Sequence, residues 1–314
     1  MPTGNDRTLR TAPAVSPVPR RRAGTTTLSV VHRKERTGIV ALAVPDLEEP
    51  YFAELTALLV RRADQRGLSV LIQQTAGDHE REVNVANGIG LPATDGLIHI
   101  PRALSVADLT RRATPGPLVL LGEHILVSPF THVTIDNRAA SYAAAEHLAQ
   151  VGCARVAYVG TRDARPSDAA DRRYTGYRDA VAALGLAQDP DLVAQLDAFT
   201  PDEGLRAVAD LLRRGVAFDG LVCANDSVAF GALVALEAGG RSVPGDVAVV
   251  GIDDVRGARF TVPALTSVAP DKEALVERAL SELERQIATP PGGNLPVEHV
   301  VVGARVVPRA STAR

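Results

Sequence analysis

The chain has 314 residues, of which 46% are hydrophobic and 23% are charged, and its formal net charge is −3. This length exceeds what a single hydrophobic core usually supports, so we expect two lobes of roughly 150 residues each. The near-neutral charge provides no overall basic field for nucleic acid or for an anionic membrane surface. No run approaches the ~18–20 apolar residues that a membrane span requires, so we expect no membrane association.

Residues 1–36 differ from the rest of the chain. They are rich in Thr, Pro and Arg and show no sustained helical or strand period, so we expect them to be disordered. The short apolar run "TLSVV" after "PRRRAG" does not reach the roughly 7–15 apolar residues of an export signal. Cys153 and Cys223 have no CxxC or Cys/His neighbourhood. We therefore expect a reduced, cytoplasmic protein without a metal or other cofactor.

Strand and helix patterns alternate after residue 36. The near-continuous apolar run "GIVALAV" is typical of a parallel strand that is covered on both faces. The following segment, 51–65, is amphipathic and predicts a helix, because Phe52, Leu55 and Leu58 fall on one stripe. Further helices are expected within "DHEREVNVANGI" and near 105–113. The expected strands of this first series are 38–44, 68–74, 95–100, 116–122 and 132–135.

A second series begins near Asn137. Its best-marked helix start is "FTPDEGLRAVADLL", where Thr200 predicts an N-cap, Pro201 the first helical position and Glu203 a capping box. Repeated β-α units imply right-handed crossovers and parallel sheets, so we expect an α/β fold with two doubly wound lobes. The other expected helices are 138–150, 171–184, 226–237 and 271–288, and the expected strands are 154–160, 191–196, "FDGLVCA", "DVAVVGI" and strands near 297–308.

The residues that follow the strands suggest a binding pocket. In open α/β sheets, ligands bind beyond the carboxyl ends of the strands. Carboxylates, an amide and a guanidinium suit hydroxyl-rich ligands, and aromatic faces cover the C–H surface of a sugar or stack on a base. This pattern indicates binding rather than a reaction centre. The residues in these positions are Asp46, Tyr51, Phe52, Thr75, Asp78, Asp136, Asn137, Arg172, Arg173, Phe199, Asn225, Asp226, Asp253 and Asp254.

Several of these residues also have a structural interpretation. Asp226 is either an N-cap of the helix that follows or a ligand contact. Phe199 precedes an N-cap and is either a hydrophobic staple or a stacking residue. Arg173 lies on an amphipathic helix, where arginines are often only solvated. Tyr51 and Phe52 are either core residues or the wall of a pocket.

The order of motifs resembles the sensor domain of the LacI/GalR family of transcriptional regulators. The resemblance covers residues from about 36 to 312. It rests on motifs that match the family's first β-α unit, the junction between its lobes, its Arg-x-x-Gly-aromatic helix, its most specific sequence signature and its last strand. In that order they read "GIVALAVPDLEEPYFAEL", "TIDNRAASYAAAEHLAQVGCARVAYVG", "RRYTGYRDAV", "CANDSVAFGALVALEAGGRSVPGDVAVVGIDD" with "PALTSV", and "VVPRAST".

The resemblance implies a periplasmic-binding-protein-like fold with three crossings between the lobes, near 136–137, 266–268 and 290–294. The expected N-terminal lobe is 37–136 plus 268–292, and the expected C-terminal lobe is 137–267 plus 293–314. The family binds small effectors, often sugars or nucleosides, and pairs as homodimers. Carried over by motif, the expected roles are hydroxyl bonding by Arg173, Asn225 and Asp253, stacking by Phe199, a first-lobe wall of Tyr51 and Phe52, and a cleft or hinge position for Asp136.

The family's DNA reader is not visible in this sequence. Members normally begin with a helix-turn-helix head, but Pro13, Pro17 and Pro19 stand too close together for a helix interior. Operator DNA is therefore a partner that the family implies and the visible residues do not. The alternative is a stand-alone cytosolic sensor, or a solute-binding protein, for a hydroxyl-rich ligand. An enzyme is not expected, since no catalytic triad, metal cluster, Walker loop or Rossmann fingerprint is found.

Overall fold

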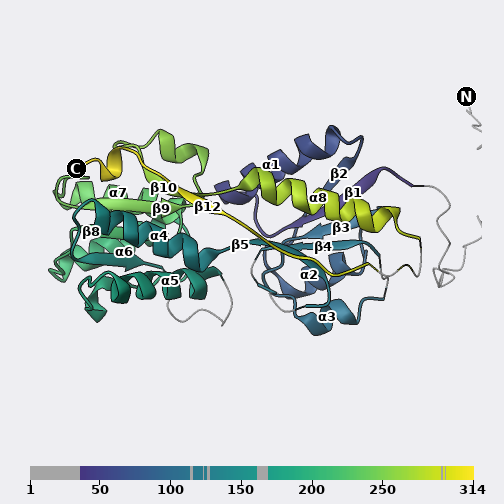
Figure 1. The fold of residues 1–314 in the computed structure, drawn as a ribbon, viewed down its shortest axis with the longest axis horizontal. Coiled ribbons are helices and arrows are strands. Elements are labelled where there is room, and N and C mark those ends of the chain that lie inside the picture. Colours follow the sequence, from purple (N-terminus) through teal and green to yellow (C-terminus); the bar gives the residue numbers. More distant parts are fainter. Residues whose placement is uncertain are drawn as a thin grey trace, which may run out of the picture. The chain divides into compact units, whose positions relative to one another are not determined.

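A computed structural model describes residues 36–113, 116–122, 124–125, 128–160, 169–290, 293 and 295–314. All but the last residue of the segment expected to be disordered, 1–36, lie outside this range. The described residues form two α/β lobes, each built on one sheet (Figure 1). None of the described helices is long and apolar enough to span a bilayer.

The first sheet has the strand order β11-β5-β4-β3-β1-β2, and all of its described pairings are parallel. Near-complete burial of β1, β3, β4 and β5 explains their unbroken apolar runs. Its strands are β1 (Ile39–Val44), β2 (Ser69–Gln74), β3 (Gly96–His99), β4 (Leu118–Leu121), β5 (Thr131–Ile135) and β11 (His299–Val302).

Helices cover both faces of the first sheet. Leu42 and Val44 of β1 face one core with α1 and α8, whereas Ala41 and Ala43 face a second core with α2 and α3. This alternation is what a doubly wound sheet requires, because successive side chains of a strand point to opposite faces. The helices are α1 (Pro50–Asp64), α2 (His79–Ala86), α3 (Val106–Thr110) and α8 (Lys272–Ala288).

The second sheet repeats this arrangement with the order β12-β10-β9-β8-β6-β7, in which only β12 is antiparallel to its neighbour. One face packs against α6 and α7 and the other against α4 and α5. The elements are β6 (Val156–Val159), β7 (Val193–Ala194), β8 (Gly220–Cys223), β9 (Ala248–Ile252), β10 (Thr266–Pro270), β12 (Ala304–Val307), α4 (Asn137–Gln150), α5 (Ala169–Ala183), α6 (Pro201–Arg213), α7 (Asp226–Ala238) and the 3-10 turns η1 (Pro190–Leu192), η2 (Arg256–Arg259) and η3 (Ala310–Thr312).

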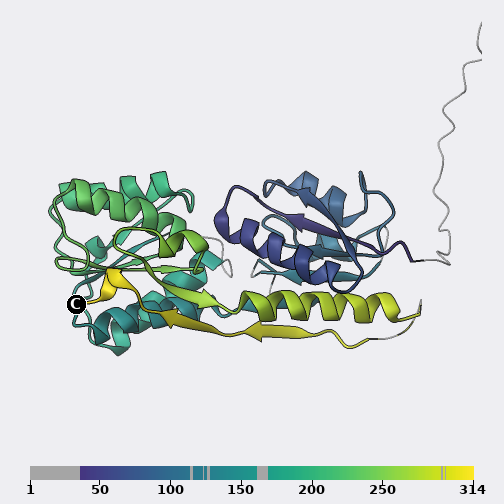
Figure 2. The ribbon, with the colours of Figure 1, turned by 90° about the horizontal axis from the view of Figure 1, so that it is seen from above.

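The chain crosses between the lobes three times, and each crossing is a single residue between two elements. Asp136 joins β5 to α4, Asp271 joins β10 to α8, and Gly303 joins β11 to β12. Figure 2 shows the C-terminal strands, in yellow, passing from one lobe to the other beside α8.

Two of the expected crossings differ from the observed ones. The second crossing lies at Asp271 rather than within 266–268, because β10 pairs with β9 and β12 of the second sheet throughout. The third lies at Gly303 rather than near 290–294, because β11 pairs with β5 of the first sheet. The expected assignment of all of 293–314 to the C-terminal lobe is therefore wrong for β11. The backbone carbonyl of Gly303 accepts a hydrogen bond from the amide of Asp271 at 3.0 Å, which ties two crossings together.

The start of α6 follows its expectation in part. Thr200 is the N-cap and its side chain accepts a hydrogen bond from the amide of Glu203. The Glu203 carboxylate does not return to Thr200 but accepts from the amide of Asp197 at 3.0 Å and pairs with Arg206. The reciprocal half of the capping box is thus replaced by a contact to the preceding loop.

Helices α6 and α7 pack so closely that only glycine fits at two reciprocal positions. A Cβ at Gly204 would lie 2.1 Å from the carbonyl oxygen of Val228, and a Cβ at Gly231 would lie 1.8 Å from that of Pro201. Backbone therefore meets backbone at this helix pair.

We expect Gly231→Ala to destabilise the protein by about 1–3 kcal/mol through overpacking, although alanine is the better helix former by about 1 kcal/mol. Urea unfolding followed by circular dichroism measures the change. Val234→Ala on the exposed face of the same helix is the control, and we expect it to be near neutral. An unchanged midpoint for Gly231→Ala would contradict the close backbone contact.

Candidate effector site

A buried guanidinium organises the strand ends of the second lobe. Arg173 of α5 is only 6% exposed. Its Nε donates to Oδ1 of Asn137 at 2.6 Å, its Nη1 to the carbonyl oxygen of Ala224 at 2.6 Å, and its Nη2 to Oδ1 of Asp253 at 3.2 Å. The alternative interpretation of Arg173 as a solvated helix residue is therefore wrong, since this arginine is buried and paired.

The Arg173 partners come from three different elements. Asn137 begins α4, Ala224 follows β8, and Asp253 follows β9. Because these strands are parallel neighbours, their carboxyl ends meet at one edge of the sheet. Asp253 has a φ of 109°, a conformation that residues other than glycine rarely adopt, and its carboxylate pairs with the guanidinium at 3.2 Å.

Asn225 lies at the same edge of the sheet, and its side chain makes two different contacts. Its Oδ1 accepts the hydrogen bond of the Val228 amide at 2.9 Å, so Asn225 and not Asp226 is the N-cap of α7. Its amide nitrogen donates to Oε1 of Glu49 in the first lobe at 3.4 Å. One side chain thus caps a helix and presents a donor towards the opposite lobe.

Asp226 is a structural residue. It is fully buried and accepts hydrogen bonds from Ser267 Oγ at 2.6 Å and from the amide of Val255 at 2.8 Å. Burial, reinforced by the negative charge of Asp253, raises the pKa of Asp226 well above its usual value. Its carboxyl group therefore joins the start of α7 to the segments after β9 and in β10.

The first lobe contributes Glu49, which the sequence-based list omits. Glu49 is the N-cap residue of α1, but its side chain reaches the second lobe, where Oε1 accepts from Ser227 Oγ at 3.0 Å. Burial raises the pKa of Glu49 to about 7; the hydrogen bond from Ser227 opposes this shift and the charge of Asp253 adds to it. The carboxyl group that touches the opposite lobe therefore titrates near neutrality.

The aromatic candidates pack against the hydrophobic cores of their lobes. Tyr51 and Phe52, in the first turn of α1, form an edge-to-face pair with ring centroids 5.4 Å apart and pack against the first-lobe core. The ammonium group of Lys272 lies 5.7 Å from the centroid of the Tyr51 ring. Phe199, just before the cap of α6, is half-buried and packs against both second-lobe cores. These contacts fit the core interpretation, whereas a hydrophobic staple by Phe199 has no apolar partner because the N4 residue of α6 is Gly204. The ligand-contact interpretation stays a prediction.

Asp136 is used differently from the other candidates. It is exposed and caps α4, accepting from the amide of Ala139 at 2.9 Å. Its neighbour Asn137, which is fully buried, is the residue that joins the Arg173 cluster. The structure thus brings together Arg173, Asn225 and Asp253, adds Asn137, Ser227 and Glu49, and places Asp136 at a lobe crossing.

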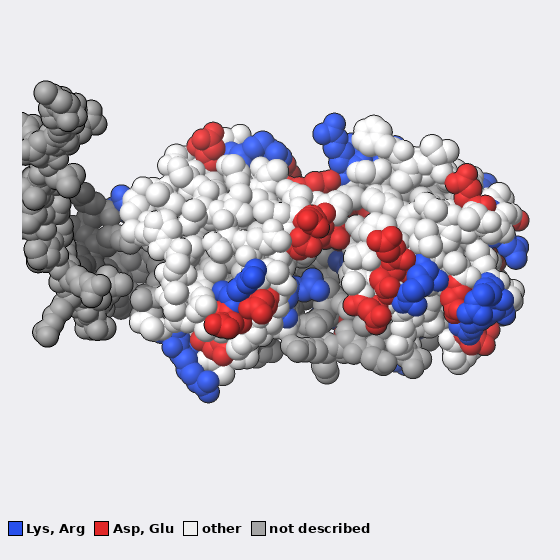
Figure 3. Space-filling view, turned by 180° about the vertical axis from the view of Figure 1, so that it is seen from behind, with Lys and Arg blue, Asp and Glu red and all other residues white. Residues whose placement is uncertain are grey.

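Charged side chains elsewhere are mixed in sign. On the face that Figure 3 shows, lysine and arginine side chains alternate with acidic ones in small groups, and no broad field of one sign covers the described residues of this face. Within the described part of the chain, no group of three or more His, Cys, Asp or Glu side chains could hold a metal ion. The polar cluster at the strand ends is therefore the strongest candidate site.

Two doubly wound lobes, three single-residue crossings and a buried polar cluster at the strand ends define a periplasmic-binding-protein-like sensor fold. The family model of the periplasmic binding protein-like domain matches residues 145–312. The transcriptional regulator AscG of Escherichia coli K12 is 31% identical over 74% of this chain and 69% of its own length.

Solved structures agree with these matches. A LacI-family transcriptional regulator from Sanguibacter keddieii is 38% identical, with a TM-score of 0.82 over 89% of this chain and 100% of that one. The regulator CelR in complex with cellobiose is 29% identical, with a TM-score of 0.75 over 88% of this chain and 85% of that one. This chain therefore belongs to the LacI/GalR family of transcriptional regulators, and its two lobes form the effector-binding domain.

We expect Arg173→Ala to lower the free energy of unfolding by about 3–5 kcal/mol, because it leaves the buried Asp253 carboxylate without this guanidinium. Urea unfolding measures the loss. The double variant Arg173→Ala/Asp253→Asn removes both charges, and we expect it to recover part of the stability. Arg178→Ala on the same helix, whose side chain is exposed, is the control. Equal stability of the single and double variants would contradict a buried ion pair.

Glu49 predicts a specific pH dependence. Its pKa is about 7 in the folded protein and 4.5 in an unperturbed carboxyl group, so the folded state binds the extra proton between these values. Its contribution to stability is full below pH 4.5 and is lost as the pH rises through 7. We therefore expect Glu49→Gln to gain stability relative to the wild type as the pH rises from 5 to 8. Melting temperatures at each pH test this, with the exposed neighbour in Glu48→Gln as control; parallel curves for Glu49→Gln and wild type would refute it.

Proposed function

We propose that this LacI/GalR-family regulator binds a small hydroxyl-rich effector, of the sugar or nucleoside class, between its lobes, and that binding changes its affinity for operator DNA. The observation that carries the proposal is the buried Arg173–Asp253 pair with Asn225 beside it, facing Glu49 of the first lobe. Family membership favours this function over a stand-alone sensor or a transport protein.

The chemistry of the site supports a hydroxyl-rich effector. A hydroxyl group both donates and accepts, and the site offers acceptors on Asp253 and Glu49 and a donor on Asn225. A hydrogen bond between a hydroxyl group and an ionised side chain is about twice as strong as one between two neutral groups. The CelR structure contains cellobiose, which supports the same class for this chain.

We assign the candidate residues as follows. Arg173, Asn225 and Asp253 bond effector hydroxyls, and Phe199 covers an apolar face of the effector. Tyr51 and Phe52 form the first-lobe wall. Asp136, as the cap of α4 at a crossing, acts in the hinge.

The effector acts by changing the relation between the lobes. Glu49 contacts Asn225 and Ser227 across the lobe boundary, and an effector hydroxyl that binds the Asn225 amide competes with this contact. A ligand shifts an equilibrium only through its different affinity for the two states, and this exchange of partners provides such a difference. The three crossings transmit the rearrangement.

The catalytic inactivity, cellular location and oligomeric state that we propose for this chain are those expected for its family. The relatives are transcriptional regulators, and we propose that this chain likewise binds and signals without catalysis, in the cytoplasm and as a homodimer.

Phe260 and Val262 are 72% and 94% exposed and follow η2 in the sequence. We place the second-lobe contact between the two copies there.

Asn225→Ser separates the two roles of this side chain. Serine caps helices as well as asparagine does, so we expect the melting temperature without effector to stay near that of the wild type. The lost amide donor should weaken effector binding about tenfold, the equivalent of one hydrogen bond of about 1.5 kcal/mol. Isothermal titration with a panel of mono- and disaccharides and nucleosides measures the affinity. Thr200→Ser, at the N-cap of α6, is the control.

The regulatory half of the proposal is tested on DNA. The full chain is assayed against random genomic fragments at several salt concentrations, with and without the effector that the titration identifies. We expect sequence-selective binding that the effector alters in the wild type and alters less in Asn225→Ser at the same effector concentration. An effector that binds tightly but leaves DNA affinity unchanged would show that the proposed coupling is wrong.

A further inference from the structure

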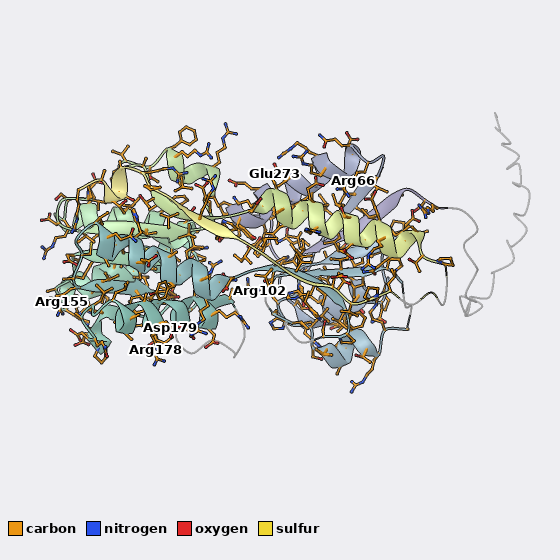
Figure 4. All side chains as sticks on the ribbon, in the orientation of Figure 1. Arg66, Arg102, Arg155, Arg178, Asp179 and Glu273 are labelled. Atoms are coloured by element: carbon orange, nitrogen blue, oxygen red, sulfur yellow. The ribbon has the colours of Figure 1, made fainter. Side chains whose placement is uncertain are left out.

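A second hollow lies at the hinge, on residues other than those of the candidate effector site. Its volume is about 840 Å³, within the range of about 300–1,000 Å³ that small-molecule sites occupy. Helix α1 of the first lobe forms one wall, and η2, the end of β10 and the start of β12 form the others. Glu273, labelled in Figure 4, marks the α8 end of this hinge pocket.

The acidic side chains of the hinge pocket are all engaged. Three of the carboxylates form ion pairs with a Lys or Arg side chain, and the fourth caps a helix. Glu54 pairs with Lys272 at 2.7 Å, Asp254 pairs with Arg309, Asp271 caps α8 through the amide of Ala274 at 2.9 Å, and Glu273 pairs with Arg62 at 2.7 Å.

The arginines of the hinge pocket are not engaged in the same way. Among the described residues, the guanidinium groups of Arg61, Arg256 and Arg305 have no hydrogen-bond or ion-pair partner. The guanidinium of Arg259 has only a distant contact, 4.0 Å from Asp254. Arg61 comes from the first lobe and the other three from the second. Positive charge from both lobes is therefore available in the hinge pocket to bind an anion.

We propose that the hinge pocket binds a small phosphorylated metabolite, with Arg256 and Arg305 as the principal phosphate contacts and Arg61 as the contact from the first lobe. The guanidinium group suits this ligand because its planar fork offers parallel donors to phosphate oxygens and keeps its charge at any physiological pH. The backbone amide of Arg256 is already bound to Glu54 at 2.5 Å, which fixes the origin of that side chain.

The hinge pocket and the candidate effector site share one turn of the chain. Asp253 and Asp254 are consecutive and both have positive φ angles, of 109° and 46°. The Asp253 carboxylate binds Arg173 in the candidate effector site, whereas Asp254 lines the hinge pocket. An anion that binds beside Asp254 and bridges the lobes therefore changes the affinity of the effector site, and the effector changes anion affinity by the same factor. This coupling rests on the proposed function, but the anion site itself does not.

Inorganic pyrophosphate is the probe for the test. Isothermal titration at constant ionic strength compares the full-length wild type with Arg256→Ala/Arg305→Ala, and we expect the double variant to bind pyrophosphate about tenfold more weakly or worse. The control is Arg206→Ala/Arg213→Ala, which makes the same change of charge on the exposed face of α6 in the same lobe. We expect the control to bind as the wild type does.

Three outcomes would overturn the hinge site: equal affinity in the wild type and the hinge variant, equal losses in the hinge variant and the control, or binding of sulfate as tight as that of pyrophosphate, which marks an adventitious ion only. Saturating pyrophosphate should also shift effector affinity in the wild type and not in the hinge variant. If pyrophosphate binds as expected but no sugar or nucleoside binds at all, the hinge site stands and the proposed effector function fails.

Discussion

The burial of one positive charge sets the geometry on which the rest of the site depends. The Arg173 guanidinium is withdrawn from water, and such a charge persists only where its donors are met. Three of its acceptors belong to the start of α4 and to the ends of β8 and β9. These three segments are therefore held at fixed separations, and the second lobe presents a rigid, preorganised edge to its ligand.

The first lobe meets this rigid edge through a much softer contact. Glu49 reaches Ser227 and Asn225 from the loop before α1, and its carboxyl group changes charge near neutral pH. A contact of this kind is easily exchanged for another partner, unlike the buried pair on the opposite side. The asymmetry suits a sensor, because one surface recognises the ligand while the other moves in response.

The sequence predicts those parts of the site that depend on strand ends alone. Arg173, Asn225 and Asp253 converge because their elements belong to neighbouring parallel β-α units, and such units place their carboxyl ends together. Glu49 could not be found in this way, because its partner lies 178 residues away in another lobe. The third crossing was misplaced for a similar reason: β11 and β12 read as one strand region, and only their pairing with different sheets divides them at Gly303.

The three crossings also constrain how this domain can be inherited. A cut at Asp136 separates the first sheet from β11 and α8, a cut at Asp271 separates β12 from the second sheet, and a cut at Gly303 removes β12 while leaving both lobes on one fragment. No single break in the chain therefore yields either lobe complete and separate from the other. Gene fission or the exchange of one lobe between relatives would require breakpoints at all three crossings, so we expect the two lobes to be inherited together even though each has its own core.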